Sequence, residues 1–409
     1  MKARWIHVDI NSYFATLLQQ ENPLLRGKPV GILKGAGRTC VIAASKEAKK
    51  LGVRTGCRKR DALELAPNII FVPAEFDLYL DATKRLKALF ESLTPHVEVF
   101  SLDEAFLDLS DCSQLYPDAH VFGRMIQKKI KEELGEWVTC NVGISYNRLL
   151  SKLASEVSEK GSVVEITPEN RDIFLTKTQF SQVCGVGYRL EKRLRRFGVT
   201  CPYLINFMSD ELLLTHFGPF WSKELRKIGQ GEESSLLEKS DRHQPMKSVG
   251  RSITGYQLCD DEERIRQVIR NLIEEVVYKA RRLKMAGRYV AIGLKGEDHS
   301  YWNAHRTLQY SIQHSSEMFD VIYNQLYKSW KRNFKIIRFS VQLGMLEFSA
   351  NLNESLLPQW QRQEKLSQAT DAITKKYGLF TLYPGTLLRT KVIRPEVTGF
   401  LGDKQYQFM

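Results

Sequence analysis

The stretch FSLDEAFLDLS, residues 100–110, decides how the N-terminal part of the chain is interpreted. Its apolar and β-favouring residues predict a strand, yet Asp103 and Glu104 stand side by side within it. Neighbouring residues of a regular strand point to opposite faces, so these two carboxylates could not share a partner there. Burying either one ionised and unpaired would also be costly. We therefore expect a turn or bulge at residues 103 and 104, where the alternation fails.

The segments around this stretch alternate between strand and helix patterns. Strands are expected near residues 3–10, 30–33, 39–45, 69–73 and 138–145, with a hairpin over 96–110. Helices are expected near residues 11–21, 46–53, 57–65, 76–93, 120–134 and 147–158. Strands and helices that alternate and then pair antiparallel predict an α+β sheet domain over residues 1–168.

The next segment changes to short helices. Residues 180–200, FSQVCGVGYRLEKRLRRFGVT, have the order helix, GxG turn and basic helix, which predicts a helix-hairpin-helix. The backbone at Gly185 and Gly187 could approach a nucleic-acid phosphate closely, with Arg189 just beyond. The alternative is that the GxG turn only connects two helices.

The C-terminal half predicts a second small domain. A linker is expected at residues 237–246, followed by a β-α-β-β-α-β pattern over 247–350. Basic residues interleave with β-favouring ones in its strands, and on a one-sided sheet they could follow a phosphate backbone. The candidates are Lys247, Arg251, Arg306 and Arg338. The alternative is a solvated outer face. Residues 351–409 hold one amphipathic helix and a strand-like end.

Composition limits the class of protein. The 409 residues carry a formal net charge of +13, which favours a polyanionic partner, nucleic acid before membrane surface. Seven scattered cysteines without a CxxC pair argue against a disulfide framework and against structural zinc. No apolar run is long enough for a membrane span, and the N-terminus is a poor secretory signal. We expect a cytoplasmic, nucleoid-associated protein and no membrane contact.

A third acidic residue, Asp9, indicates a possible chemical role for the pair at residues 103 and 104. Asp9 ends the first predicted strand, so all three carboxylates could gather on one sheet. Such a group could hold two Mg²⁺ ions, which prefer oxygen ligands and serve phosphoryl and nucleotidyl transfer. Alternatively, Asp9 is a cap or turn residue, and the adjacent acids are a solvated part of a hairpin.

Three segments together resemble the palm motifs of Y-family DNA polymerases, the translesion enzymes. They are HVDINSYFA (7–15), SLDEAFLDLS (101–110) and NVGISYNRLLSKLAS (141–155), in this order and at this spacing. The resemblance implies a multidomain α+β right-hand polymerase. Its domains would be a palm (1–19 and 74–168), fingers (20–73), a helix-hairpin-helix thumb (169–236), the linker and a little finger (247–350). The tail (351–409) is similar to the extension of the bacterial UmuC/ImpB/DinB-like branch.

The resemblance also implies site residues and ligands. Asp9, Asp103 and Glu104 would be the catalytic metal ligands, with the Ile10 carbonyl as a further ligand. The metals would be two Mg²⁺ ions, for which Mn²⁺ can substitute. Phe14 would be the steric gate that excludes a ribose 2′-OH, with Tyr13 beside the nucleotide. The enzyme would extend primer-template DNA with dNTPs at low fidelity, without a proofreading exonuclease, in the SOS response.

Two departures from the family pattern concern the triphosphate. The fingers of the family commonly present a Tyr and an Arg three residues apart, where this chain has Lys46 and Lys49. Lysine neutralises phosphate but lacks the bidentate fork of arginine. Lys160 is assigned to the triphosphate although it lies one position off the family register. The C-terminal QYQFM, Gln405 to Met409, is a candidate peptide for binding a sliding clamp.

Two other functions are consistent with parts of the pattern. A non-catalytic DNA-binding scaffold would use the thumb and the basic sheet, but it has no need for all three acids. A nucleotidyl cyclase could use a related two-metal palm, but it leaves the thumb and the C-terminal domain unexplained. Template dependence of nucleotide incorporation distinguishes the three.

Overall fold

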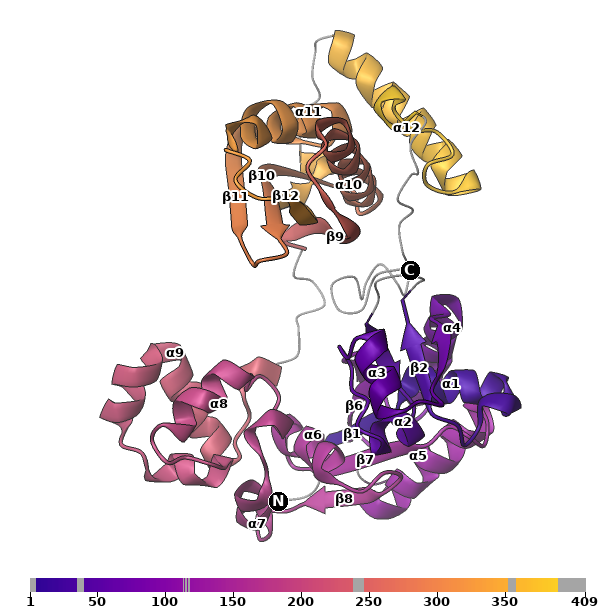
Figure 1. Ribbon diagram of the computed structural model, residues 1–409. Coiled ribbons are helices and arrows are strands. Elements are labelled where there is room, and N and C mark those ends of the chain that lie inside the picture. Colours follow the sequence, from indigo (N-terminus) through magenta and orange to yellow (C-terminus); the bar gives the residue numbers. More distant parts are fainter. Residues whose placement is uncertain are drawn as a thin grey trace. The chain divides into compact units, whose positions relative to one another are not determined.

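The computed structural model describes residues 5–34, 40–112, 114, 116, 118–237, 246–351 and 358–388. The chain forms two compact units, with the boundary between Ser240 and Asp241 (Figure 1). Each unit has its own hydrophobic core. Among the helices in these described ranges, none is both long and apolar enough to cross a bilayer.

A five-stranded sheet in the order β5-β6-β1-β7-β8 forms the centre of the first unit. Its strands are β1 (Trp5–Ile10), β5 (His96–Val99), β6 (Glu104–Asp108), β7 (Cys140–Ser145) and β8 (Val163–Ile166). The central strand β1 pairs antiparallel with both β6 and β7, whereas β7 and β8 are parallel. The sequence analysis did not predict β8.

Helices cover both faces of this sheet. Helices α1 (Tyr13–Glu21), α4 (Phe76–Glu91) and α5 (Ala119–Leu134) pack on one face, and α6 (Arg148–Val157) lies on the other. Gly143 of β7 allows α6 to approach closely, because a Cβ there would lie 2.0 Å from the Ser151 carbonyl oxygen. Residues of β1 and β6 that face α6 therefore lie beside the side chains of that helix.

The hairpin of β5 and β6 breaks the strand alternation at the acidic pair, as predicted. Asp103 lies in the bend between the two strands, and Glu104 is the first residue of β6. The backbone N–H groups of Phe100 and Ser101 both approach the Glu104 carbonyl oxygen, at 2.8 and 3.2 Å, and close the bend. The strict alternation of a regular strand therefore does not apply across Asp103 and Glu104.

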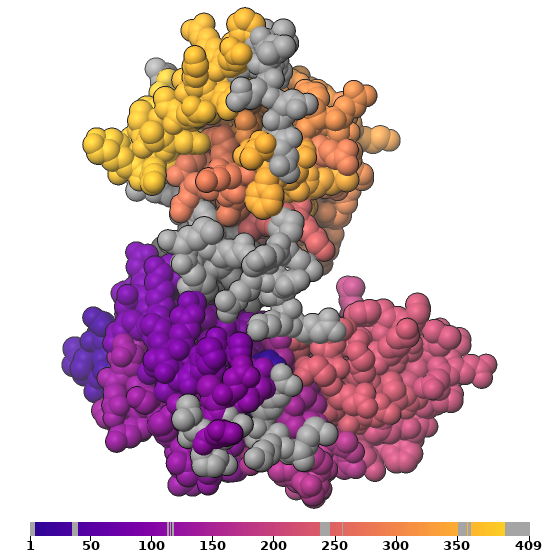
Figure 2. Space-filling view, turned by 180° about the vertical axis from the view of Figure 1, so that it is seen from behind, coloured from indigo at the N-terminus to yellow at the C-terminus, as the bar shows by residue number. Residues whose placement is uncertain are grey.

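Two smaller parts complete the first unit. The segment predicted as fingers contains the three-stranded sheet β3-β2-β4 and two short helices. These are β2 (Val30–Leu33), β3 (Val41–Ala44), β4 (Ile70–Pro73), α2 (Lys46–Lys50) and α3 (Lys59–Leu65). The segment predicted as the thumb is helical. Its α-helices are α7 (Arg171–Lys177), α8 (Tyr188–Arg195) and α9 (Asp210–Gln230), with 3-10 turns at Phe180–Gln182 and Pro202–Phe207. Figure 2 shows the thumb, in pink, as a lobe beside the purple palm and fingers.

The second unit has the predicted β-α-β-β-α-β order. Its sheet, β11-β10-β12-β9, is antiparallel throughout and covered by helices on one face. The elements are β9 (Ser248–Cys259), α10 (Glu262–Arg282), β10 (Met285–Gly296), β11 (Tyr301–Ile312), α11 (Ser315–Phe319) and β12 (Ile336–Phe348). The second helix of this order is α-helical only in α11, and continues as a π-helical turn (Asp320–Leu326) and a 3-10 turn (Tyr327–Ser329).

The tail helix α12 (Pro358–Tyr377) belongs to this second unit. The Arg281 guanidinium of α10 donates two hydrogen bonds to the Asp371 carboxylate, each 2.7 Å long. His314 also lies 3.1 Å from the Ser367 hydroxyl. Polar contacts therefore attach the tail helix to the predicted little finger. The predicted strand-like end and the peptide at residues 405–409 lie outside the described residues.

Glu317 on α11 predicts a pH-dependent stability of the second unit. Burial raises the pKa of its carboxyl to about 7 from 4.5, and its Oε1 atom has no hydrogen-bond partner. Between these two values the folded state binds more protons than the unfolded state, so stability falls as the pH rises through 7. We expect Glu317→Gln to stabilise α11 by about 1–2 kcal/mol at pH 8.5, after discounting for solvent screening, and by much less at pH 5. Hydrogen exchange of the α11 amides at both pH values measures this. An equal effect at both pH values would contradict the assignment.

Candidate active site

The structure brings the three predicted carboxylates together on the central sheet. Asp9 of β1 lies directly opposite Glu104 of β6 in the antiparallel pairing. The backbone N–H of Ile10 donates to the Asp103 carbonyl oxygen at 3.0 Å, which fastens the bend to the end of β1. Residues 94 positions apart in sequence thus become neighbours.

Mutual repulsion and burial are visible in the pKa values of these acids. The pKa of Asp9 rises from 3.8 to about 7, chiefly through burial and then through the charges of Asp103 and Glu104. Burial also raises the pKa of Asp103, while a 2.5 Å hydrogen bond from the Ser101 hydroxyl opposes the rise. Positive charge placed near these carboxylates would therefore stabilise their ionised forms.

Lys152 of α6 supplies part of that charge. Its Nζ donates to Glu104 Oε2 at 2.8 Å, and both side chains are mostly buried. His7 Nε2 lies 3.9 Å from the same oxygen, and its Nδ1 lies 2.6 Å from the Ser155 hydroxyl. Burial, reinforced by the nearby cations, holds the pKa of His7 well below its ordinary value, so the ring is neutral. Glu104 is thus oriented by α6.

The side chains of the three acids do not form a complete metal-binding site by themselves. Within the described ranges, no three His, Cys, Asp or Glu side chains are placed so that together they could hold a metal ion. Two of the carboxylates instead have protein partners: Ser101 donates to Asp103, and Lys152 donates to Glu104. The donor set of buried carboxylates still fits a hard divalent cation, because it offers oxygen ligands.

Two of the three lysines assigned to the triphosphate lie near the acids. Lys49 Nζ donates to the Ser12 hydroxyl at 2.9 Å, and the charges of Lys160 and Asp9 both act on its pKa, which burial lowers. The charge of Lys160 in turn lowers the pKa of Asp9. Lys46 Nζ lies 4.7 Å from the centre of the Trp137 ring instead, and its assignment to the triphosphate stays a prediction. The first position of α2 points it toward that ring.

Phe14 and Tyr13 have different environments, although they are adjacent on α1. The Phe14 ring is partly buried and stacks on Tyr79 with the ring centres 4.2 Å apart. Tyr13 is 3% exposed, and its hydroxyl donates to the Tyr79 carbonyl oxygen at 2.7 Å. Tyr13 therefore ties α1 to α4, and its assignment to nucleotide binding stays a prediction.

The glycine turn of the predicted thumb has the expected backbone. Gly185 has a φ of +86°, and a Cβ there would lie 2.5 Å from the Leu236 side chain. Gly187 is the N-cap of α8 and has open space around its Cα, with Arg189 exposed two residues further along the chain. The turn therefore leaves the start of α8 accessible to a ligand.

The basic residues assigned to the sheet of the second unit lie on different faces of it, because side chains alternate along a strand. Arg251 lies on the helix-covered face and forms a 2.7 Å ion pair with Glu275 of α10. Arg306 donates to Gln325, which belongs to the π-helical turn. The assignment of both residues to a common DNA-binding face is therefore wrong. Arg338 is exposed and donates to the Ser252 hydroxyl at 3.1 Å, and Lys247 is exposed at the start of β9.

The uncovered face of this sheet is a shallow, polar depression of about 460 Å³. Arg338 lines it together with residues of all four strands, including Ser252, Tyr289 and Asn303. The Tyr289 and His305 rings stack there with their centres 5.3 Å apart.

Lys152 and His7 are site residues that the sequence analysis did not single out. A signal existed for Lys152: the helix RLLSKLASEV carries two cations, four residues apart, and follows a strand of the catalytic sheet directly. For His7 the signal was weaker, because a histidine in a buried strand is usually a core residue.

Comparisons with known proteins decide the family. The impB/mucB/samB family model matches residues 8–156, and the impB/mucB/samB family C-terminal domain matches residues 246–356. A DNA polymerase IV from Moorella thermoacetica is 30% identical over 375 residues, which cover 90% of this chain and 92% of the relative. The chain belongs to the Y-family DNA polymerases. It is a DNA-directed DNA polymerase of the bacterial DinB/UmuC type.

Other relatives of this Y-family polymerase agree. A DNA polymerase IV from Acetivibrio thermocellus is 29% identical over 398 residues, covering 96% of this chain and 99% of the relative. A solved Y-family chimera of Dbh and Dpo4 has the same fold, with a TM-score of 0.74 at 24% identity, over 84% of this chain and 99% of that one. The predicted family and multidomain fold are thereby confirmed.

Proposed function

We propose that this Y-family polymerase extends primer-template DNA with dNTPs by two-metal nucleotidyl transfer, without proofreading. The observation that carries the proposal is the meeting of Asp9, Asp103 and Glu104 on the central sheet. The proposal keeps the four predicted domains, palm, fingers, thumb and little finger, with the ranges given above.

The three carboxylates would hold two Mg²⁺ ions, or Mn²⁺ in their place, with the Ile10 carbonyl as an added oxygen ligand. When bound, such ions polarise the α-phosphate, lower the pKa of the primer 3′-OH and neutralise charge on the departing pyrophosphate. The protein residues orient this chemistry. Ser101 positions Asp103. In the proposal, the bend at residue 103 lets the Asp103 and Glu104 carboxylates face the same ions.

The nucleotide would lie between the acids and α1. Lys49 and Lys160 bring positive charge to the triphosphate, and both already act electrostatically on the acidic group. The Phe14 ring, supported by Tyr79, would lie under the deoxyribose, where it leaves no room for a 2′-OH.

DNA would be held by two separate parts of the chain. In the thumb, the turn at Gly185 and Gly187 offers backbone N–H groups to a phosphate, with Arg189 adjacent. In the little finger, the uncovered sheet face contributes Arg338, with Lys247 at the start of its first strand. Contact of residues 405–409 with a sliding clamp stays a prediction.

Substituting two arginines of the little finger should affect DNA binding in one case and stability in the other. Arg338→Ala should weaken DNA binding and lower the slope of log K against log salt by about 1, since it removes one phosphate contact. Arg251→Ala breaks the buried pair with Glu275 and should cost about 3–5 kcal/mol of stability instead. Fluorescence anisotropy across a salt series, alongside denaturant unfolding, tests both. A salt slope that falls for R251A but not for R338A would reverse the assignment of faces.

Primer extension on a defined template tests the proposed function against its alternatives. Incorporation that follows the template base supports the polymerase, whereas template-independent turnover of a nucleoside triphosphate would support a cyclase. DNA binding without incorporation would support the scaffold. Persistence of mismatched primer ends, followed over time, reports the absence of proofreading.

A further inference from the structure

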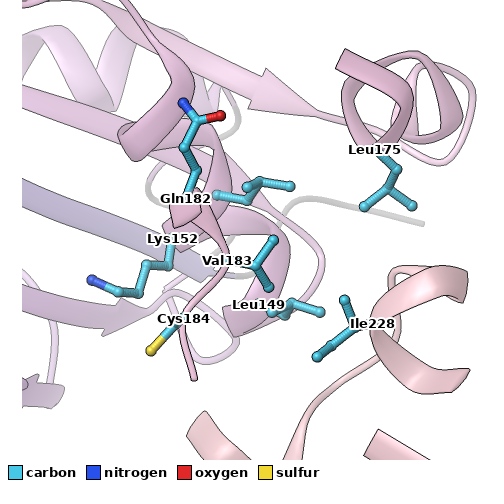
Figure 3. Close-up of a pocket in the computed structure, with 8 residues that line it drawn as sticks. Leu149, Lys152, Leu175, Gln182, Val183, Cys184 and Ile228 are labelled. Carbon is cyan, nitrogen blue, oxygen red and sulfur yellow. The ribbon is translucent and has the colours of Figure 1, made fainter. Parts of the chain in front are cut away.

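Lys152 occupies an unusual place between the catalytic sheet and the thumb. Its ammonium makes the 2.8 Å contact with Glu104 Oε2 and lies 4.9 Å from the centre of the Phe100 ring. Figure 3 shows Lys152 with Leu149, Val183 and Cys184 around a crevice between α6 and the thumb. The side chain is 13% exposed, so the contact is shielded from bulk water.

This contact occupies Oε2 of Glu104, one of the two oxygens of a carboxylate that the proposed function assigns to a divalent ion. Burial first, and then the charges of Asp103 and Glu104, raise the pKa of Asp9. The ammonium charge of Lys152 opposes this rise and also acts to lower the pKa of Asp103. Among the described residues no ready-made ligand group is present, and Glu104 is held toward α6.

We propose that Lys152 is a placeholder cation, which holds Glu104 in the metal-free enzyme and must be displaced when a divalent ion binds there. The inference rests on the proposed function and concerns the regulation of the same site. Lys152 is a positioning residue, since it acts through Glu104.

Physical considerations favour displacement over sharing. A divalent ion carries twice the charge of the ammonium and requires close oxygen ligands. An ammonium and a divalent ion on one buried oxygen would repel each other strongly, since Coulomb energies rise as the surroundings exclude water. The four-carbon lysine stem is flexible, so rotation of the side chain can take the ammonium away from Glu104.

The consequence is a lowered affinity for metal in the absence of substrate. A divalent ion that binds to Glu104 through Oε2 must first break the contact with Lys152. Removing the ammonium should therefore strengthen metal binding, whereas a lysine that merely rigidifies Glu104 would, on removal, weaken it. The two roles therefore predict changes of opposite sign in metal affinity when the ammonium is removed.

Mn²⁺ binding to the nucleotide-free enzyme, measured by electron paramagnetic resonance of the free ion, tests this directly. We expect Lys152→Gln to bind Mn²⁺ about tenfold more tightly than wild type, and Lys152→Arg, which keeps the charge, to bind no more tightly than wild type. Lys128→Gln is the matched control, because it removes the same charge from an exposed pair with Glu132 on α5. It should leave Mn²⁺ binding unchanged.

A further variant separates this inference from the proposed function. If Mn²⁺ does not bind to wild type, or if Asp103→Asn leaves its binding unchanged, the proposed metal site fails. If binding depends on Asp103 but Lys152→Gln weakens it or leaves it unchanged, the site stands and the placeholder role is refuted.

A measurement on the wild-type protein avoids dependence on the folding of the variants. Lysine side-chain nitrogen resonances can be followed by NMR, with Lys152 assigned by its absence in K152R. Titration with Mg²⁺ should abolish the hydrogen-bonded signal of the Lys152 ammonium as the site fills. A signal that stays unchanged at saturating Mg²⁺ would overturn the proposal.

Discussion

Replacing Asp103 with asparagine should lower the rate of primer extension at least about 1,000-fold, equivalent to about 4 kcal/mol of transition-state stabilisation. The substitution keeps the shape of the side chain and can still accept a hydrogen bond from Ser101, but it removes a charge from the oxygen ligand set. Single-turnover extension of a labelled primer, at saturating dNTP and DNA, isolates the chemical step from binding.

The control for this experiment is Asp81→Asn, which removes an exposed aspartate of α4. It should leave the rate unchanged. Because Asp103 is repelled by its neighbours in the metal-free state, D103N should also be at least as stable as wild type. Loss of activity with loss of folding would indicate a structural role for Asp103, and retained activity would refute the catalytic assignment.

Shortening Phe14 to alanine should relax the discrimination against ribonucleotides by about 100-fold. The ring stacks on Tyr79 at 4.2 Å, so its position is defined by a neighbour that the substitution leaves in place. Removing the ring opens space for a 2′-OH, whereas dNTP incorporation should decline much less. The ratio of kcat/KM for a dNTP and the matching rNTP, on the same template, is the measurement.

Phe76→Ala provides a matched control for this second prediction. The Phe76 ring packs edge-on against the same Tyr79 ring, with the centres 6.0 Å apart. Its removal creates a comparable packing defect but should leave the sugar discrimination intact. If F76A and F14A relax discrimination equally, the effect comes from general loosening of α4 and Phe14 is not a gate.

The expectation that Arg251 lines a DNA-binding face fails for a local physical reason. Val249 and Ile253 pack in the core of the second unit, so period-two alternation requires Arg251 to face the helices with them. The pattern of buried residues on either side of a charged residue therefore decides which face of the sheet it occupies.

The sequence alone determined the order of the elements and the residues that carry charge. The sheet domain, the glycine turn of the thumb, the β-α-β-β-α-β unit and the break at residues 103 and 104 all follow from local patterns, which depend on neighbours in the chain. The family resemblance of three short motifs then associated Asp9 with the acidic pair.

Only the tertiary structure decided which partners these residues meet. That Asp9 lies opposite Glu104, that Lys152 holds the same carboxylate and that Lys46 turns to Trp137 depend on strand pairing and helix packing between distant segments. Such contacts are set by the register of β1 with β6 and by the close approach of α6 at Gly143. Neither is encoded in any single window of sequence, because both arise when separate faces are buried together.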